Sequence, residues 1–200
     1  MLKAKIKEAA YHSGADICGI ASIERFNNVP EGFHPTDIFK DTKSVIVIAR
    51  RFPRGSVKAS TSFSYSISDD IVTGQIREIT YNTSILLEDL GVTPVPVYTE
   101  PYRYWNSETM TGKGDISLKH AGYLAGIGVF GKNQLLYNYK YGNMIKLGAL
   151  LIDAEIEPDE IQTFSFCKEN CSLCIKNCPS GALGEETVDH AGDLAQITLP

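Results

Sequence analysis

Four cysteines within twelve residues constrain this chain more than any other feature of its sequence. They are separated by three, two and three residues, and a proline follows the last one. These residues are Cys167, Cys171, Cys174 and Cys178. Closely spaced thiolates wrap around one corner of an iron-sulfur cube, and the bacterial ferredoxin run has two, two and three intervening residues before its Cys-Pro. The segment therefore predicts a [4Fe-4S] cluster held by these four ligands.

Three other uses of the cysteines stay open. A structural zinc site commonly pairs two short cysteine knuckles across a longer spacer, and it gives the Cys-Pro-Ser-Gly-Ala ending no role. The first three cysteines have the spacing of radical S-adenosylmethionine enzymes, but little chain follows to form their barrel. A third alternative, which the sequence favours least, is that the cysteines form a redox disulfide relay. In two-cluster ferredoxins the fourth cysteine binds the other cluster, so Cys178 either completes this cluster or belongs with a second cysteine group that is missing here.

Composition indicates an ordinary soluble protein. The chain has 200 residues, of which 43% are hydrophobic and 22% charged, so it can bury a real core. The sequence contains no apolar run long enough for a membrane span and no signal peptide, and we expect a cytoplasmic protein. Because no export signal is present, a disulfide framework is disfavoured. The lone Cys18 is predicted to be a buried thiol in a strand.

Charge is distributed unevenly along the chain. The net charge is −5 and the pI about 5.4, which disfavours nucleic-acid binding. Residues 101–150 carry six Lys/Arg and two Asp/Glu, whereas residues 151–200 carry two and ten. A basic block of this kind marks either a site for an anionic ligand or a solvated charged face.

Hydrophobic periodicity and turn residues predict alternating helices and strands. We expect helices at 2–13, 68–90 and 116–125, strands at 16–21, 44–49, 92–99, 129–137 and 144–152, and loops at 27–41 and 53–67. The second helix is predicted to turn five side chains inward, namely Ile71, Ile76, Ile79, Ile85 and Leu86. This order predicts an α+β protein, an α/β sandwich over residues 1–160 followed by a ferredoxin-like segment at 161–200.

A glycine-rich block precedes the cysteines. Gly126, Gly128, Gly131 and Gly142 lack side chains at points where the backbone turns or approaches something flat or anionic. Taken alone, these glycines are better explained by turns that join a helix to two strands.

The order of short motifs gives a resemblance. A helix ends in Ala-Gly-Ile-Gly, then come Phe-Gly-Lys-Asn at 130–133, Tyr141-Gly142 before a strand, and a Cys-Pro-Ser-Gly-Ala-Leu ending at 178–183. This order resembles the epoxyqueuosine reductase family of iron-sulfur proteins, which is itself similar to reductive dehalogenases. The resemblance implies a nitroreductase-like α/β sandwich that carries a corrinoid (cobalamin), with FMN as the less favoured cofactor, and a small C-terminal ferredoxin-type helical segment. The residues that would line the cofactor by resemblance are Gly126, Gly128, Gly131, Lys132, Asn133, Tyr141 and Gly142.

Two residues are candidates for proton transfer. The resemblance implies an acidic donor ahead of the third predicted helix, and Asp115 is the nearest carboxylate. His120, at the start of that helix, is a candidate to donate to a cofactor or to act as an acid near neutral pH. An aromatic cluster is predicted to stack on a macrocycle or to pack in the core or an interface; its members are Tyr98, Tyr102, Tyr104 and Trp105.

Together these features predict an oxidoreductase. Electrons would pass from a donor such as a ferredoxin or flavodoxin to the [4Fe-4S] cluster, and then to a corrinoid that reduces a small-molecule substrate. The alternative is a ferredoxin-like electron carrier or accessory protein with no substrate of its own.

Overall fold

The centre of the molecule is a four-stranded antiparallel sheet. The computed structural model describes residues 2–97, 99, 102–108, 111–181 and 183. In spatial order the strands are β1 (Ile17–Ser22), β2 (Ser44–Arg51), β8 (Ile145–Ile152) and β3 (Pro94–Pro96). The two central strands pair along their whole length. They are almost continuous apolar runs because both faces of the sheet are covered.

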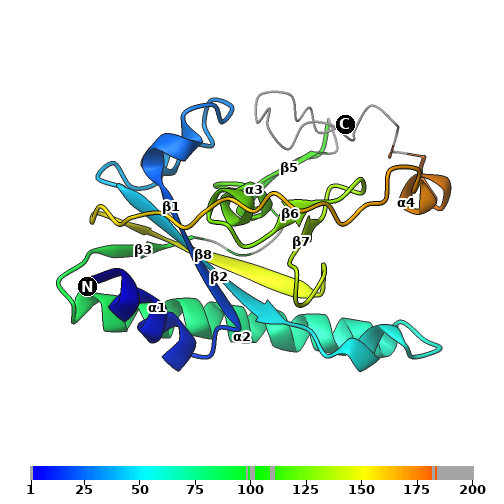
Figure 1. Cartoon of the computed structure of the whole chain (residues 1–200), viewed down its shortest axis with the longest axis horizontal. Coiled ribbons are helices and arrows are strands. Elements are labelled where there is room, and N and C mark those ends of the chain that lie inside the picture. Colours follow the sequence, from blue (N-terminus) through cyan, green and yellow to red (C-terminus); the bar gives the residue numbers. More distant parts are fainter. Residues whose placement is uncertain (1, 98, 100–101, 109–110, 182, 184–200) are drawn as a thin grey trace.

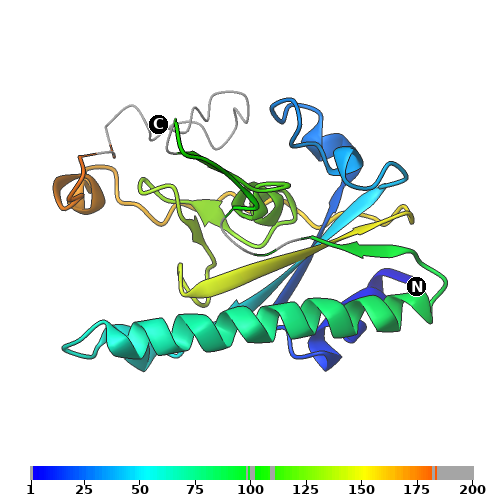
Figure 2. The same ribbon diagram turned by 180° about the vertical axis from the view of Figure 1, so that it is seen from behind.

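Helices cover the two faces of this sheet unequally (Figures 1 and 2). On one face lie α1 (Leu2–His12) and α2 (Phe63–Glu88), and on the other lies the shorter α3 (Leu118–Leu124). The long helix α2 overhangs the sheet, so its first turns project past the end of the strands (Figure 1).

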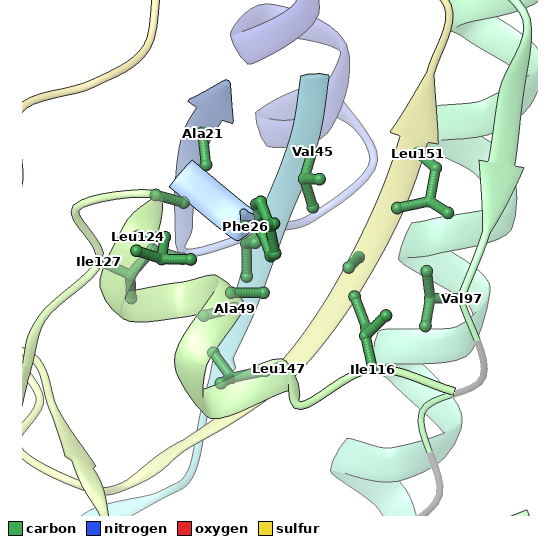
Figure 3. Close-up of a cluster of buried hydrophobic side chains, with 14 of the residues drawn as sticks. Ala21, Phe26, Val45, Ala49, Val97, Ile116, Leu124, Ile127, Leu147 and Leu151 are labelled. Atoms are coloured by element: carbon green, nitrogen blue, oxygen red, sulfur yellow. The ribbon is translucent and has the colours of Figure 1, made fainter. Parts of the chain in front are cut away.

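Each face of the sheet has its own hydrophobic core. Alternate residues of β2 point to opposite faces: Val45 and Val47 pack with Leu124 of α3, whereas Ile46 and Ile48 pack with α1 and α2. Figure 3 shows the cluster on the α3 side, where Phe26 lies beside Leu124 of the helix and Leu151 projects from β8. Each fully buried aliphatic side chain contributes roughly 1.5–3 kcal/mol.

The remaining elements are short. Two hairpins are formed by β4 (Tyr104–Asn106) with β5 (Thr111–Lys113) and by β6 (Val129–Phe130) with β7 (Leu136–Tyr137). A single helical turn, α4 (Leu173–Lys176), lies in the cysteine segment, and 3-10 turns occur at η1 (Ile23–Phe26), η2 (Pro35–Asp37) and η3 (Arg54–Val57). In the part of the chain that the structure describes, no helix is long and apolar enough to span a membrane.

Most predicted elements are confirmed, including the α+β class, the edge position of β3 and the short helix among the cysteines. The single strand predicted at 129–137 is wrong, because a turn at 131–135 folds it into the β6–β7 hairpin. The predicted loop 53–67 is also partly wrong, since η3 and the start of α2 lie within it. Position 98 lies outside the described residues.

Two inward-facing predictions on α2 are wrong. Ile76 and Ile79 are buried, but Ile71 is 55% exposed and Ile85 is 43% exposed. Ile71 lies toward the overhanging end of the helix, and at Ile85 the neighbouring Thr83, Ser84 and Leu87 are buried instead. The face of α2 that packs on the sheet is therefore not the face predicted from the positions of its isoleucines. The buried face also includes Thr80, Thr83 and Ser84.

Candidate functional site

Residues 153–166, here called the connector, carry the chain from the end of β8 to the cysteines and are held in place by ion pairs. Asp159 accepts a hydrogen bond from the backbone N–H of Ile20 and pairs with Lys3 and Lys7 at 3.0 and 2.7 Å. Burial opposes its charge, but the hydrogen bonds from Lys7 and Lys3 outweigh that effect and lower the pKa of this carboxyl. The connector is thereby fixed to β1 and α1, which sets where the following segment begins.

The glycine-rich block contacts the cysteine segment through Lys132. Its backbone N–H donates to Sγ of Cys167 at 3.4 Å, and its Nζ donates to the carbonyl of Glu169 at 3.1 Å. A backbone amide aimed at sulfur stabilises thiolate character and tunes a metal centre. The turn after β6 thus supplies a polar neighbour to the first predicted ligand.

Aromatic rings hold the same two segments together. Tyr137 of β7 packs on Phe166 with ring centroids 5.1 Å apart, and Phe164 packs against Phe166 and Tyr139 at 5.5 and 5.8 Å. Such tilted and edge contacts stabilise beyond their burial alone. The β6–β7 hairpin is therefore the platform on which the chain enters the cysteine segment, and α4 lies beyond it at that end of the molecule (Figure 1).

The four predicted ligands lie on turns of one short segment, and among the described residues none of them is in a disulfide. All four are half-buried, and backbone hydrogen bonds close turns from Cys171 to Lys168 and from Cys178 to Ile175. Within the described ranges, no group of three or more His, Cys, Asp or Glu side chains is close enough to hold a metal ion. The donor chemistry of four thiols suits an iron-sulfur cluster, but their convergence would have to accompany binding, as is common when metal binding drives local folding.

Two glycines that were predicted to line the cofactor, Gly126 and Gly128, are also needed for the packing of the backbone. Gly126 has φ of +71°, and a Cβ there would lie 2.2 Å from the carbonyl of Glu160 in the connector. At Gly128 a Cβ would lie 2.2 Å from the carbonyl of Tyr137. These positions need glycine for close backbone packing, which is the turn explanation that the sequence left open.

The tip of the hairpin is held by Asn133. Its Nδ2 donates to the hydroxyl of Tyr137 at 3.0 Å, and its Oδ1 accepts from the N–H of Leu135 at 3.3 Å. A Cβ on Gly131 would lie 2.5 Å from the Tyr137 ring. In the described chain Gln134 alone among non-glycine residues has positive φ. Gly131, Lys132 and Asn133 thus form one rigid turn beside Cys167.

Tyr141 and Gly142 lie elsewhere, at a second turn. Gly142 has φ of +62° and closes a tight turn with Asn138. The Tyr141 ring lines a cavity of about 520 Å³ between the end of β2 and the start of α2. The structure therefore separates Tyr141, at this cavity, from Gly131, Lys132 and Asn133 at the hairpin turn beside Cys167.

The two proton-transfer candidates have different partners. Asp115 pairs with Arg103 at 3.4 Å, whereas His120 shares a hydrogen bond of 2.5 Å with Ser117 and stacks on Phe130 at 4.8 Å. Burial, with a smaller contribution from the charge of Lys119, lowers the pKa of His120 to about 4. His120 is therefore neutral at neutral pH, which favours the hydrogen-bonding role over that of an imidazolium acid.

Two further predictions concern side chains outside the cluster. Cys18 lies in β1 and is buried, and burial raises the pKa of its thiol to about 12, so the predicted buried core thiol is confirmed. Tyr102 and Trp105 pack on each other at 5.1 Å, and Arg103 lies 5.5 Å from the Tyr104 ring. The described aromatic residues lie about half exposed on and beside β4.

Sequence reasoning missed three structural contributors. Asp159 fixes the connector, Tyr137 packs under Phe166, and Arg25 donates to the carbonyls of Leu124 and Asp159 at 2.5 and 2.8 Å. None stands in a recognisable motif. The one sequence signal near them is the group of acidic residues at 153–160, which includes Asp159.

Comparison with known proteins identifies the relatives of this chain, although no family model matches it. It is 30% identical over 171 residues to the epoxyqueuosine reductase of Listeria monocytogenes, covering 85% of this chain and 44% of the relative. The chain is related to the epoxyqueuosine reductases and the reductive dehalogenases. Among the latter, the tetrachloroethene reductive dehalogenase of Desulfitobacterium hafniense is 27% identical over 176 residues, covering 86% of this chain and 28% of the relative.

Solved structures of these relatives share the fold. The epoxyqueuosine reductase of Streptococcus thermophilus superposes with a TM-score of 0.62 at 19% identity, over 99% of this chain and 56% of that one. A catabolic reductive dehalogenase superposes with a TM-score of 0.66 at 19% identity. The match covers 90% of this chain and 25% of the dehalogenase. The chain thus spans about half the length of the epoxyqueuosine reductases and about a quarter of the dehalogenases.

Proposed function

We propose that this chain is an iron-sulfur oxidoreductase that holds a [4Fe-4S] cluster through its four clustered cysteines. Electrons would come from a ferredoxin or flavodoxin and pass through the cluster to a bound corrinoid, where a small-molecule substrate is reduced. Relatives in two reductase families support this reading, and for one reductive dehalogenase structure the dehalogenation is B12-dependent. We further propose the nitroreductase-like assignment for the sheet, and the division into a cofactor domain at 1–160 and a cluster segment at 161–200.

The observation that carries the proposal is the contact between Lys132 and Cys167. It joins the block assigned to the corrinoid to the segment assigned to the cluster. When bound, the corrinoid would supply a reducing cobalt centre and the cluster a one-electron relay. The residues of the chain would fix the distance between the two groups: Tyr137 and Phe166 by packing, Lys132 by its two hydrogen bonds.

Within the same proposal Gly131, Lys132 and Asn133 border the corrinoid nearest the cluster. Gly126, Gly128, Tyr141 and Gly142 remain predicted lining residues. Asp115, which pairs with Arg103 at 3.4 Å, would deliver the proton. His120, neutral at neutral pH, would donate a hydrogen bond without carrying charge. A solved Bacillus subtilis relative has a catalytic aspartate on a loop that swings out of its active site, which supports a carboxylate donor.

The second candidate is an electron carrier or accessory protein with no substrate. The cysteine segment by itself supports it, because four cysteines in twelve residues can hold a cluster for electron transfer without a substrate site. Nucleic acid remains a disfavoured partner at a net charge of −5, although one epoxyqueuosine reductase was solved with a modified tRNA stem loop.

Anaerobic reconstitution tests the cluster. We expect about four iron and four acid-labile sulfide per chain, and loss of both when any one of the four cysteines is replaced by serine. Cys18→Ser is the matched control, because this buried thiol lies in the sheet, and it should leave the iron content unchanged. Zinc in place of iron in oxygen-free preparations, or full loading of the Cys178→Ser variant, would contradict the proposal.

Cofactor titration separates the two candidate functions. The reconstituted chain should change the absorption spectrum of added cobalamin and bind it saturably, and a parallel titration with FMN should not saturate. An electron carrier would load its cluster but bind neither cofactor. Gly131→Val, which places a side chain against Tyr137 at the hairpin turn, should abolish cobalamin binding while iron content is retained.

A further inference from the structure

A basic cavity lies where the end of β2, the start of α2 and the turn before β8 meet. Its volume is about 520 Å³, within the range of small-molecule sites. Four cationic side chains line it, and none of the described lining residues is acidic. These cations are Arg50, Arg51, Arg54 and Lys140.

The positive charge in this cavity is only partly neutralised. Asp16 pairs with Arg50 at 3.0 Å and with Arg51 at 3.4 Å, so one carboxylate serves two guanidinium groups. Arg50 is otherwise engaged, with hydrogen bonds to the carbonyl of Gly14 and to Gln75. Among the described lining residues, Arg54 and Lys140 have no carboxylate partner and are available to an anion, whereas Arg51 shares Asp16 with Arg50.

Tyr141 gathers two of these cations around one ring. The guanidinium of Arg51 lies 5.8 Å from the ring centroid and Nζ of Lys140 lies 5.1 Å from it. Arg54 reaches the same turn by donating to the backbone carbonyl of Lys140 at 3.4 Å. Like charges held this close repel each other, and an anion between them would remove the repulsion.

Most of the remaining lining is apolar, apart from Ser68 and Gln75. Buried Phe52 and Val72 line it, together with Ile71 and Met144. Tyr65 of α2 stacks on Phe52 with centroids 5.8 Å apart and planes nearly parallel. A ligand for this cavity would therefore combine a strongly anionic group with a flat or apolar body.

We infer that this cavity binds an organic phosphate. Arginine forks and a lysine match the several acceptor oxygens of a phosphate dianion, and the positive charges of Arg54 and Lys140 balance its two negative charges. The apolar lining would hold the organic part. This inference goes beyond the proposed function, because it requires neither the cluster nor the corrinoid.

Four probes test the inference on the full chain, before and after anaerobic reconstitution. We expect calorimetry to give saturable binding of phenyl phosphate, about tenfold weaker binding of benzoate and of inorganic phosphate, and no binding of phenol. Equal binding of phenol would overturn the inference, since no anion site would then be needed. Affinity should fall as salt is raised, because the cations are exposed.

Variants locate the site. The double variant Arg54→Gln with Lys140→Gln should weaken phenyl phosphate at least tenfold, while a charge-matched control, Lys5→Gln with Lys40→Gln, should bind as the parent does. Both control lysines are exposed and outside the cavity. Equal weakening in both pairs would indicate non-specific attraction and overturn the inference.

Cobalamin is the decisive competitor, because Tyr141 is also a predicted corrinoid residue. If phenyl phosphate and cobalamin bind together, the cavity is a separate site, as inferred. Displacement of phenyl phosphate by cobalamin would assign the cavity to the corrinoid and overturn the inference. Failure of cobalamin to bind at all would contradict the proposed function, while the phenyl phosphate titration would still decide this one.

Discussion

The backbone N–H of Lys132 donates to Sγ of Cys167 at 3.4 Å, across 35 residues of sequence. The side chain of the same lysine reaches the carbonyl of Glu169. One residue of the glycine-rich block thus contacts the cysteine segment with both its backbone and its charge. This relationship brings the hairpin turn at Gly131–Asn133 into contact with the cysteine segment.

Lys132 should tune the proposed cluster. Lys132→Gln retains the backbone N–H but removes a positive charge, so the more negative reduced cluster loses stabilisation. We expect the reduction potential to fall by about 40 mV, the equivalent of about 1 kcal/mol for one electron. Anaerobic redox titration measures it. Lys40→Gln, an exposed lysine at another place in the fold, is the control, and an equal shift in both variants would contradict a local effect.

Gly126 and Gly142 should respond differently to alanine. Both have positive φ, but a Cβ at Gly126 meets the carbonyl of Glu160 whereas Gly142 faces open space. Gly142→Ala should cost about 1–2 kcal/mol for the left-handed backbone alone. Gly126→Ala should cost about 3 kcal/mol or more, because the connector must also move. Urea unfolding gives both values, and equal costs would show that the connector does not pack tightly there.

His120 should make stability depend on pH. Its pKa in the folded chain is about 4, below the ordinary value of 6.5, so the unfolded chain binds the proton more readily. Stability should therefore fall as pH is lowered from 6.5 to 4. We expect His120→Gln to reduce that loss by about 1–2 kcal/mol, less than the full shift because solvent screens the ring.

The control for His120 is an exposed histidine. His12→Gln changes the same residue type at an exposed position and should leave the pH profile of the unfolding free energy as it is in the parent. A profile for His120→Gln that also overlays the parent between pH 4 and 6.5 would show that this ring is protonated as easily folded as unfolded.

Asp159 should hold the connector. Asp159→Asn removes the charge that Lys3 and Lys7 pair with, and we expect a loss of about 1–3 kcal/mol together with faster proteolysis near residues 160–166. Because the pKa of this carboxyl is lowered in the folded chain, its contribution is present above pH 3.8 and is lost as pH falls below that value. The asparagine variant should lack this acid-dependent part.

Glu157→Gln is the matched comparison for Asp159→Asn. It removes an exposed carboxylate from the same connector, so an effect of net charge alone would appear in both variants. Unchanged stability and proteolysis in Asp159→Asn would show that the ion pairs with α1 do not fix the connector.

The sequence predicted the elements with strong local signals. The apolar run at 44–49 has few alternatives to a strand covered on both faces, and Gly14 and Gly91 mark helix ends by their freedom at positive φ. The prediction from sequence was wrong where tertiary packing determines which side chains are buried. Ile85 is as apolar as Ile76, yet it is exposed because α2 is oriented by all its contacts with the sheet together.

The sequence by itself determined the chemistry available to this protein, because it places four thiols within twelve residues and a glycine-rich block before them. Only the tertiary structure decided which of those residues meet. It placed Lys132 at Cys167 and Tyr141 at a basic cavity, because the β6–β7 hairpin and the connector are fixed by packing between residues distant in the chain. Such contacts depend on how the elements pack in space, which local patterns do not encode.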